Sequence, residues 1–267
     1  MTAAPPMIAF VHVGKSFDGG RGGKRVVAVS DVSLQVASGE FLAIVGGSGS
    51  GKTTLLRLAN RLLDADAGRI EIEGTDVRAI DPVQLRRRIG YVFQSSGLFP
   101  HMNVGRNIGI TPKLIGTSAR QISARVDELL DLVRLDRARH RERFPHELSG
   151  GERQRVGVAR ALAARPRIVL MDEPFGALDP LTRDVLGEDY QALHAELGLT
   201  TVMITHDMTE AMLLADRVAV MRTGQLIAVG TPSELSESAD AYVRELLRTP
   251  RRQAERLKHL LPPDGAA

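Results

Sequence analysis

The chain has 267 residues, of which 43% are hydrophobic and 25% charged, as is typical of one medium-sized globular domain with or without an embedded subdomain. It has no cysteine, which excludes disulfides, thiolate metal sites and cysteine nucleophiles, and its net charge of +3 gives no reason to expect a nucleic-acid partner. We expect no signal peptide, because Met1–Pro6 lacks an apolar core, and no membrane span, because no run of about 18 apolar residues occurs.

Two strands are predicted near the N-terminus, over Ile8–Val13 and Arg25–Ala37, with a glycine-rich turn at Asp18–Gly23 between them. Phe17 lies just before that turn. An aromatic side chain at this point either packs inside the loop or offers a stacking surface to a purine ring, and the residues alone leave both readings open.

A phosphate-binding loop follows the next predicted strand. Phe41–Val45 is an apolar run typical of a buried strand, and Thr54–Leu63 has the periodicity of a helix. The sequence GGSGSGKT between them fits the pattern G-x-x-x-x-G-K-[ST], in which backbone N–H groups surround a phosphate chain at a helix start. The residues predicted to form this site are Gly46, Gly47, Ser48, Gly49, Ser50, Gly51, Lys52, Thr53 and Thr54.

The next elements are a short strand at Arg69–Glu73, a short helix from Asp81-Pro82 to Arg88, and a buried strand, Ile89–Phe93, that ends at Gln94. A polar residue at the carboxyl end of a strand in an α/β sheet points to the ligand crevice, although a lone Gln is more often polar surface.

The stretch Ser95–His146 has a different character. Glycine and proline interrupt its first part, so we expect no regular element there, whereas Ser118–Leu135 has the pattern of one strong amphipathic helix. No strand is evident. The sequence therefore predicts a helical subdomain, at about 95–160, inserted into the sheet domain.

The sequence LSGGERQR, Leu148–Arg155, predicts a helix start. Ser149 is a good N-cap, and Glu152 completes the capping-box spacing before a helix that we expect to reach Ala164. Gly150 and Gly151 leave bare backbone N–H groups at the positive end of the helix dipole. The stretch is either a second anion site or only a capped surface helix.

Paired carboxylates follow the apolar strand Arg167–Met171, at Asp172 and Glu173. Two acids at the tip of a buried strand are costly unless they bind something there. A magnesium ion on phosphates would fill that need, with Asp172 holding the ion and Glu173 acting as general base on a water molecule.

The last third of the chain predicts a helix from Asp179-Pro180 to Leu197, a strand at Thr200–Thr205, a helix capped by Asp207, and a hairpin at Arg217–Val229. His206 directly follows the strand, at the sheet edge expected for Gln94 and Glu173. A basic helix and a loose tail are expected in 241–267.

In this order, the motifs resemble those of the nucleotide-binding subunit of an ABC transporter, over residues 8–240. The phosphate loop is followed by Gln94 as the Q-loop, LSGGE, the Walker B acids, the D-loop at Gly176–Asp179 and the switch His206. The resemblance implies an α/β P-loop NTPase (RecA-like) core sheet with an N-terminal antiparallel β subdomain and an inserted α-helical subdomain.

The resemblance also implies that two copies pair head to tail around two ATP molecules, each phosphate loop facing the partner's Ser149–Gly151. Asp179 belongs to the D-loop, and Gly47 stands where many importer relatives have Pro. The implied roles are phosphate contact for Lys52, magnesium binding for Thr53, Asp172 and Gln94, orientation of water for Glu173, γ-phosphate contact for His206, and adenine stacking for Phe17.

Within the family, the stretches 60–74, 81–108 and 172–183 look most like those of osmoprotectant importers for glycine betaine, choline, carnitine or proline. The subunit would lie on the cytoplasmic face of the membrane, with a permease docked near Gln94 and the helical subdomain, and would serve a solute-binding protein indirectly. Many such ATPases carry regulatory CBS domains after the cassette; from the length of this chain we expect none.

Four alternatives can be set against this interpretation. The first is an importer for polar amino acids or anions, or a lipid-trafficking cassette, because the same ATPase would serve. A non-transport ABC ATPase acting on DNA or the ribosome is disfavoured, since the sequence has one cassette, no heptads and no cysteines. A small P-loop kinase or GTPase does not explain LSGGE or the pair Gln94 and His206, and a scaffold without turnover would lack Glu173.

Overall fold

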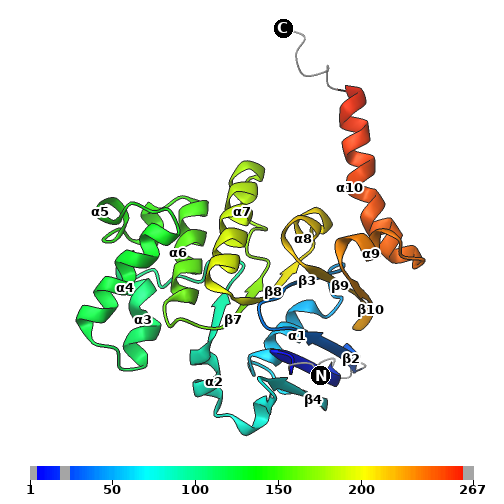
Figure 1. The fold of residues 1–267 in the computed structure, drawn as a ribbon, viewed down its shortest axis with the longest axis horizontal. Coiled ribbons are helices and arrows are strands. Elements are labelled where there is room, and N and C mark those ends of the chain that lie inside the picture. The colour runs from blue at the N-terminus through cyan, green and yellow to red at the C-terminus, as the bar shows by residue number, and fades with distance from the viewer. Residues whose placement is uncertain (1–4, 19–24, 261–267) are drawn as a thin grey trace.

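The computed structural model describes residues 5–18 and 25–260. The glycine-rich turn predicted at Asp18–Gly23 therefore lies outside the described residues except for Asp18, as does the tail beyond Leu260. Figure 1 shows most of the strands on the right-hand side of the molecule and the green helices of the insert on the left.

The smaller sheet is the antiparallel subdomain. Its order is β2-β1-β4-β5, formed by β1 (Ile8–Phe17), β2 (Val26–Val36), β4 (Ala67–Ile72) and β5 (Thr75–Asp76), the last of which the sequence did not predict. A 3₁₀ turn, η1 (Val77–Ala79), and the helix α2 (Pro82–Arg88) follow it. Val32, Leu34 and Val36 alternate with exposed residues because successive side chains of a strand point to opposite faces.

The larger sheet forms the centre of the molecule. Its order is β10-β9-β3-β8-β7-β6, with β3 (Phe41–Val45), β6 (Ile89–Val92), β7 (Ile168–Asp172), β8 (Thr200–Thr205), β9 (Arg217–Arg222) and β10 (Gln225–Gly230). All neighbouring strands are parallel except the edge pair β9 and β10. Every residue of β3 is buried, as expected of a strand covered on both faces.

Side chains of β3 divide the core into two layers. Leu42 and Ile44 pack in the cluster that contains the antiparallel sheet, α1 (Lys52–Ala59) and α2, whereas Phe41, Ala43 and Val45 pack in the cluster that contains most of the other helices. These helices include α6 (Gly150–Leu162), α7 (Pro180–Leu197) and α8 (Met208–Leu214). The fold therefore has the core sheet, the antiparallel β subdomain and the helical insert that the motifs implied.

The first part of the helical insert corrects our prediction. We expected Gly105, Gly109 and Pro112 to interrupt regular structure, but they lie inside α3 (Val104–Leu114), which packs against α4 (Ala119–Leu132). A Cβ at Gly109 would lie 2.7 Å from Cγ2 of Ile122, so glycine permits close packing of the two helices. Tertiary contact outweighs the poor helix propensity of glycine here. The insert also contains α5 (Arg137–His140) and η2 (Pro145–Glu147).

The first helix also differs from its predicted range, Thr54–Leu63. α1 begins at Lys52 and ends at Ala59, and the chain turns at Arg61, which has a positive φ of 48°. The Arg61 guanidinium donates hydrogen bonds to the backbone oxygens of Val77 and Ile80, at 3.2 and 2.9 Å. These long-range bonds hold the chain out of the helix, which the periodicity of the sequence could not indicate.

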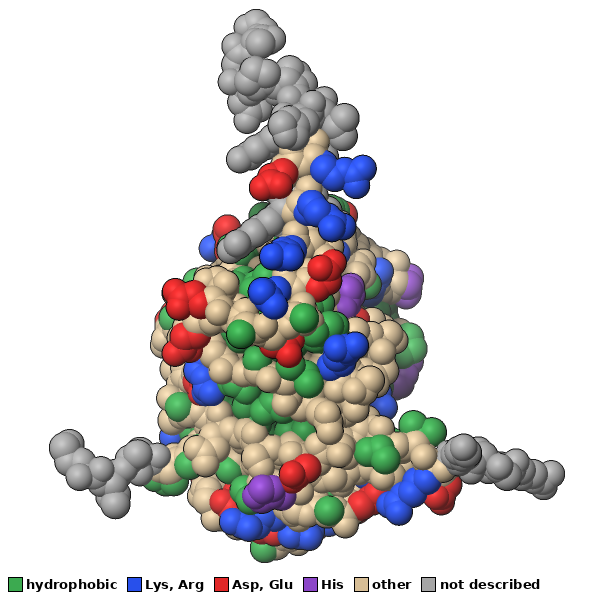
Figure 2. All heavy atoms as spheres, turned by 90° about the vertical axis from the view of Figure 1, so that its right-hand side faces the viewer, with side chains coloured by type: hydrophobic (Ala, Val, Ile, Leu, Met, Phe, Trp, Pro, Cys, Tyr) green, Lys and Arg blue, Asp and Glu red, His purple; other side chains and the backbone are tan. Residues whose placement is uncertain are grey.

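The C-terminal part consists of α9 (Pro232–Ser236) and α10 (Ala241–Leu260). The first turns of α10 pack on the core through Val243, and the rest of the helix projects from the body (Figure 1). Figure 2 views the molecule from the side that carries α10, and basic side chains with acidic ones between them surround the base of this helix. Within the described residues, no helix combines the length and apolarity needed to cross a bilayer.

Candidate nucleotide-binding site

Four parallel strands bring the predicted residues to one edge of the larger sheet. The carboxyl ends of β3, β8, β7 and β6 are neighbours, with Val45 opposite Thr205 and Asp172 opposite Ile204. The loops that leave these ends carry the phosphate loop, His206, Glu173 and Gln94. Ligands of open α/β sheets bind in the crevice at this edge.

The phosphate loop is held tightly between two strands. Gly46 and Gly51 have φ angles of 156° and 99°, and a Cβ at either position would lie 2.2 Å from a backbone oxygen, that of Met221 or of Ala28. Only glycine fits such close approaches. Gly47, Ser48 and Gly49 form the exposed tip, Ser50 is buried, and Thr53 and Thr54 lie in the first turn of α1.

Lys52 lies inside this loop and is only 6% exposed. Its Nζ donates to the backbone oxygens of Gly46 and Gly47, at 2.7 and 3.0 Å. Burial lowers the pKa of Lys52, while the charges of Glu173 and Asp172 act in the opposite direction. The loop therefore holds an ammonium group close to two carboxylates.

Asp172 accepts hydrogen bonds from two hydroxyl groups. Thr53 Oγ1 donates to Oδ1 at 3.1 Å, and the Tyr91 hydroxyl donates to Oδ2 at 3.4 Å. Burial raises the pKa of Tyr91, so its hydroxyl stays protonated. Tyr91 was not predicted from the sequence, where it is one more residue of a buried strand; the only signal was its place in the strand that ends at Gln94.

Glu173 is the centre of a second cluster. Its Oε2 accepts a hydrogen bond from Gln94 Nε2 at 3.0 Å and lies 3.2 Å from Nδ1 of His206. Glu173 has a positive φ of 47°, an uncommon conformation outside glycine that often marks functional sites. The structure thus brings together Gln94, Glu173 and His206, which are far apart in the sequence.

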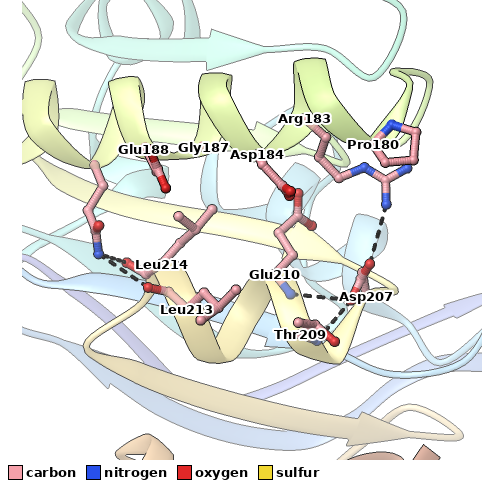
Figure 3. A pocket seen from close by; sticks show the side chains of 11 residues that line it. Pro180, Arg183, Asp184, Gly187, Glu188, Asp207, Thr209, Glu210, Leu213 and Leu214 are labelled. Carbon is pink, nitrogen blue, oxygen red and sulfur yellow. Dashed lines mark hydrogen bonds and ion pairs between the residues drawn. The ribbon is translucent and has the colours of Figure 1, made fainter. Parts of the chain in front are cut away.

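A pocket lined by charged side chains lies between α7 and α8, directly after His206 in the chain (Figure 3). Asp207 caps α8 by accepting from the backbone N–H of Thr209 and Glu210, at 2.8 and 3.2 Å. Arg183 of α7 donates to the other oxygen of Asp207 at 3.3 Å. Burial raises the pKa of Glu210 in this pocket. The start of α8, directly after His206, is therefore tied to the start of α7.

The LSGGE segment begins α6, as predicted, with a complete capping box. The Ser149 N–H donates to Glu152 Oε2 at 2.7 Å, and the Glu152 N–H donates to Ser149 Oγ at 3.2 Å. Within the described residues, no hydrogen bond joins Ser149, Gly150 or Gly151 to the phosphate loop of the same chain. A single chain thus brings the phosphate loop close to the residues that follow β6, β7 and β8. Its own α6 start is not hydrogen-bonded to that loop within the described residues.

The D-loop lies beside this helix start instead. A Cβ at Gly150 would lie 3.7 Å from Leu178 Cδ2, and one at Gly151 would lie 2.6 Å from Thr182 Cγ2. Asp179 caps α7 by accepting from the Thr182 N–H at 3.0 Å. The D-loop therefore lies between the start of α6 and the start of α7, the helix that forms one side of the pocket around Asp207.

Phe17 lies at the end of β1, paired with Val26 of β2, and is 40% exposed. Lys15 Nζ is 5.7 Å from the centre of its ring. Ala28, two residues further along β2, contacts Gly51 of the phosphate loop. The ring is therefore on the flank of the loop, with a face that a planar ligand could reach.

Comparison with known proteins agrees with this geometry. A family model described as ABC transporter matches residues 29–176. The chain belongs to the ABC transporter family. Its cassette is the ATP-binding domain of that family, and the expectation drawn from the order of the motifs is confirmed.

Two curated relatives illustrate the likeness to transport ATPases. The glycine betaine/carnitine/choline transport ATP-binding protein OpuCA of Bacillus subtilis is 47% identical over 242 residues, or 90% of this chain. The sulfate/thiosulfate import ATP-binding protein CysA of Yersinia pseudotuberculosis is 46% identical over 228 residues, or 84% of this chain. The chain spans 62% of the length of each of these relatives.

Solved ABC cassettes have the same fold. The ATP-binding cassette MJ0796, in a dimeric post-hydrolysis state bound to ADP and Pi, matches with a TM-score of 0.77 at 31% identity. The match covers 85% of this chain and 99% of MJ0796.

The capping box gives this ABC cassette a pH dependence that can be measured. Two contacts lower the pKa of Glu152 from 4.5 to about 2. The hydrogen bond from the Ser149 N–H has the larger effect, and the contact with His140 Nε2, 3.0 Å from Glu152 Oε1, has the smaller one. The stability that this carboxylate contributes should be complete above pH 4.5 and decline as the pH falls toward 2. We expect wild type to lose up to about 1 kcal/mol relative to Glu152→Gln over that range, because partial exposure screens the charge. Urea unfolding at several pH values measures this, and a pH-independent difference would contradict it.

Proposed function

We propose that this chain is the ATP-hydrolysing subunit of an ABC importer, which dimerises around two Mg-ATP and powers a separate membrane permease for quaternary-amine osmoprotectants. The single observation that carries the proposal is the Glu173 carboxylate, which accepts from Gln94 and faces His206 next to the Asp172–Thr53 pair. This arrangement offers a base, a polar group that orients the base, and oxygen ligands within one crevice.

In this proposal Glu173 takes the proton of a water whose oxygen attacks the γ-phosphorus of ATP, while the bond from that phosphorus to the bridging oxygen breaks. Lys52 and the N–H groups of the loop neutralise phosphate charge, and His206 contacts the γ-phosphate. Gln94 holds Glu173 in place, and Phe17 stacks on the adenine.

Magnesium fits the donors present. Thr53 Oγ1 and Asp172 Oδ1 lie 3.1 Å apart, and together with the amide oxygen of Gln94 they would supply an all-oxygen set of the kind that Mg²⁺ prefers. Among the described residues, no three His, Asp or Glu side chains form a metal site by themselves. The ion would therefore share its coordination with phosphate oxygens and water, and would supply charge stabilisation for phosphoryl transfer.

Head-to-tail dimerisation follows from the separation of the two anion-binding segments. The start of α6, with Ser149, Gly150 and Gly151, is a helix N-terminus of the kind that binds phosphate. Because no hydrogen bond among the described residues joins it to its own phosphate loop, we assign it to the nucleotide of a second copy, with Asp179 at the same interface. The dimeric state of the MJ0796 relative supports this assignment.

A groove beside Gln94 is our proposed docking site for the permease. It has a volume of about 540 Å³ and lies between the end of β6, α3 and the segment after α1. Leu62, Phe93, Phe99 and Leu114 line it and are between 41% and 59% exposed. Exposed apolar side chains gathered in a groove are typical of a protein-binding site. Docking there would place the subunit on the cytoplasmic face of the membrane.

The solute class rests on the likeness to osmoprotectant relatives, with a polar anion or amino acid as the alternative that the CysA likeness supports. Uptake of labelled glycine betaine at high osmolarity should be lost in cells without this subunit. It should return with the wild type but not with Glu173→Gln. Unchanged uptake, with competing osmolyte systems removed, would reject the osmoprotectant assignment and direct the search to anion and amino-acid permeases.

A further inference from the structure

One peptide group of the phosphate loop is hydrogen-bonded at both ends. The oxygen of Gly46 accepts from Lys52 Nζ at 2.7 Å, and the N–H of Gly47, in the same peptide group, donates to the hydroxyl oxygen of Tyr242 at 3.2 Å. Hydrogen bonds at the two ends of one peptide group polarise it and strengthen each other. Tyr242 belongs to α10, which lies 195 residues away in the sequence.

The Tyr242 side chain is held in place by its surroundings. Asp240 Oδ1 accepts from the backbone N–H groups of Tyr242 and Val243, at 2.8 and 3.0 Å, and Val243 is fully buried. The guanidinium carbon of Arg222 lies 4.9 Å from the centre of the Tyr242 ring, within cation–π distance. The hydroxyl therefore meets the loop from a fixed helix start.

The hairpin beside Arg222 holds the same loop at a second point. After β9 ends at Arg222, Gly224 of the turn donates its N–H to the backbone oxygen of Ser50 at 3.0 Å. The outer side of the phosphate loop is thus supported by the β9–β10 turn and by α10. Of these two supports, α10 is the one that projects from the body (Figure 1).

We propose that Tyr242 is a positioning residue for the phosphate loop, through which the placement of α10 sets the affinity of this loop for nucleotide. The inference rests on the proposed ATPase function and adds to it an input from the C-terminal helix. Displacing the start of α10 removes the hydroxyl from Gly47, and the peptide group that also binds Lys52 loses one of its two restraints.

Tyr242→Phe tests the hydroxyl alone, because the ring that packs against Arg222 remains. We expect the KM for ATP and the Kd for mant-ATP, measured by fluorescence titration with Mg²⁺, to rise about 2- to 10-fold, the range for one hydrogen bond. The kcat should change less than KM, because the loop binds substrate and transition state alike. A fall in kcat with an unchanged KM would indicate general structural damage and overturn the proposal.

A double-mutant cycle identifies the partner. Gly47→Pro removes the donating N–H, so Tyr242→Phe should have no further effect on the Kd in that background. Gly47→Ala keeps the N–H and is the matched control, since its Cβ would lie 3.7 Å from the Tyr242 hydroxyl, an ordinary contact. Tyr242→Phe should keep its full effect there. Equal effects in both backgrounds would overturn the proposal.

The link to α10 has its own test. Val243→Ala loosens the start of α10 without touching the hydroxyl, and should raise the Kd for mant-ATP less than additively with Tyr242→Phe. Val126→Ala, which opens a similar cavity in α4, should leave the Kd unchanged. Equal Kd changes in the two alanine variants would overturn the role of α10. Failure of the wild-type chain to bind mant-ATP would instead reject the nucleotide function, and this proposal with it.

Discussion

Replacing Glu173 by Gln is expected to remove nearly all steady-state ATP hydrolysis while leaving ATP binding intact. A positioned general base contributes about 10²- to 10⁴-fold to such reactions. Gln has almost the same size and its amide oxygen can still accept from Gln94, so the cluster around His206 should keep its geometry. What the amide cannot do is take a proton from the attacking water. Phosphate release measures the rate, and mant-ATP titration measures binding.

The same variant should accumulate as an ATP-bound dimer, detectable by light scattering, because a sandwich that cannot hydrolyse ATP does not reopen. Glu196→Gln is the matched control: it makes the same chemical change on an exposed part of α7, outside the Asp207 pocket, and should leave turnover unchanged. Unimpaired hydrolysis by Glu173→Gln would remove Glu173 as the base. Loss of binding together with hydrolysis would show a structural rather than a chemical effect.

Ser149→Arg is expected to prevent ATP-driven dimerisation and to reduce hydrolysis at least about 10²-fold, as expected when groups that stabilise the transition-state charge are lost. The two glycines after Ser149 leave the α6 start open to a close approach, and a long side chain at its N-cap would fill that space. Light scattering in the Glu173→Gln background, with and without ATP, measures the dimer.

Ser149 also caps α6, so the loss of the cap must be separated from the loss of the binding surface. Ser149→Ala removes only the hydroxyl that accepts from the Glu152 N–H and should cost about 1 kcal/mol of stability. It should still dimerise to a large extent, whereas Ser149→Arg should not. A normal ATP-dependent dimer of Ser149→Arg would refute the head-to-tail arrangement.

Much of the candidate site could be predicted because its parts are local. The glycines of Gly46–Thr53, the capping box at Ser149 and the N-caps at Asp179 and Asp207 each depend on residues within a few positions. The apolar runs of β3, β7 and β8 placed their ends at one sheet edge, because parallel strands share their direction. That was enough to predict Gln94, Glu173 and His206 as neighbours.

The sequence by itself determined the order of the elements, the phosphate loop and the family, because spacing and local backbone chemistry carry that information. Only the tertiary structure decided that Tyr91 bonds to Asp172 across 81 residues and that Tyr242 bonds to Gly47 across 195. It also decided that α3 forms despite its glycines and that α1 ends at Ala59. The physical reason is the same in each case: the deciding contact joins segments distant in the chain, and its energy exceeds the local preference of the residues involved.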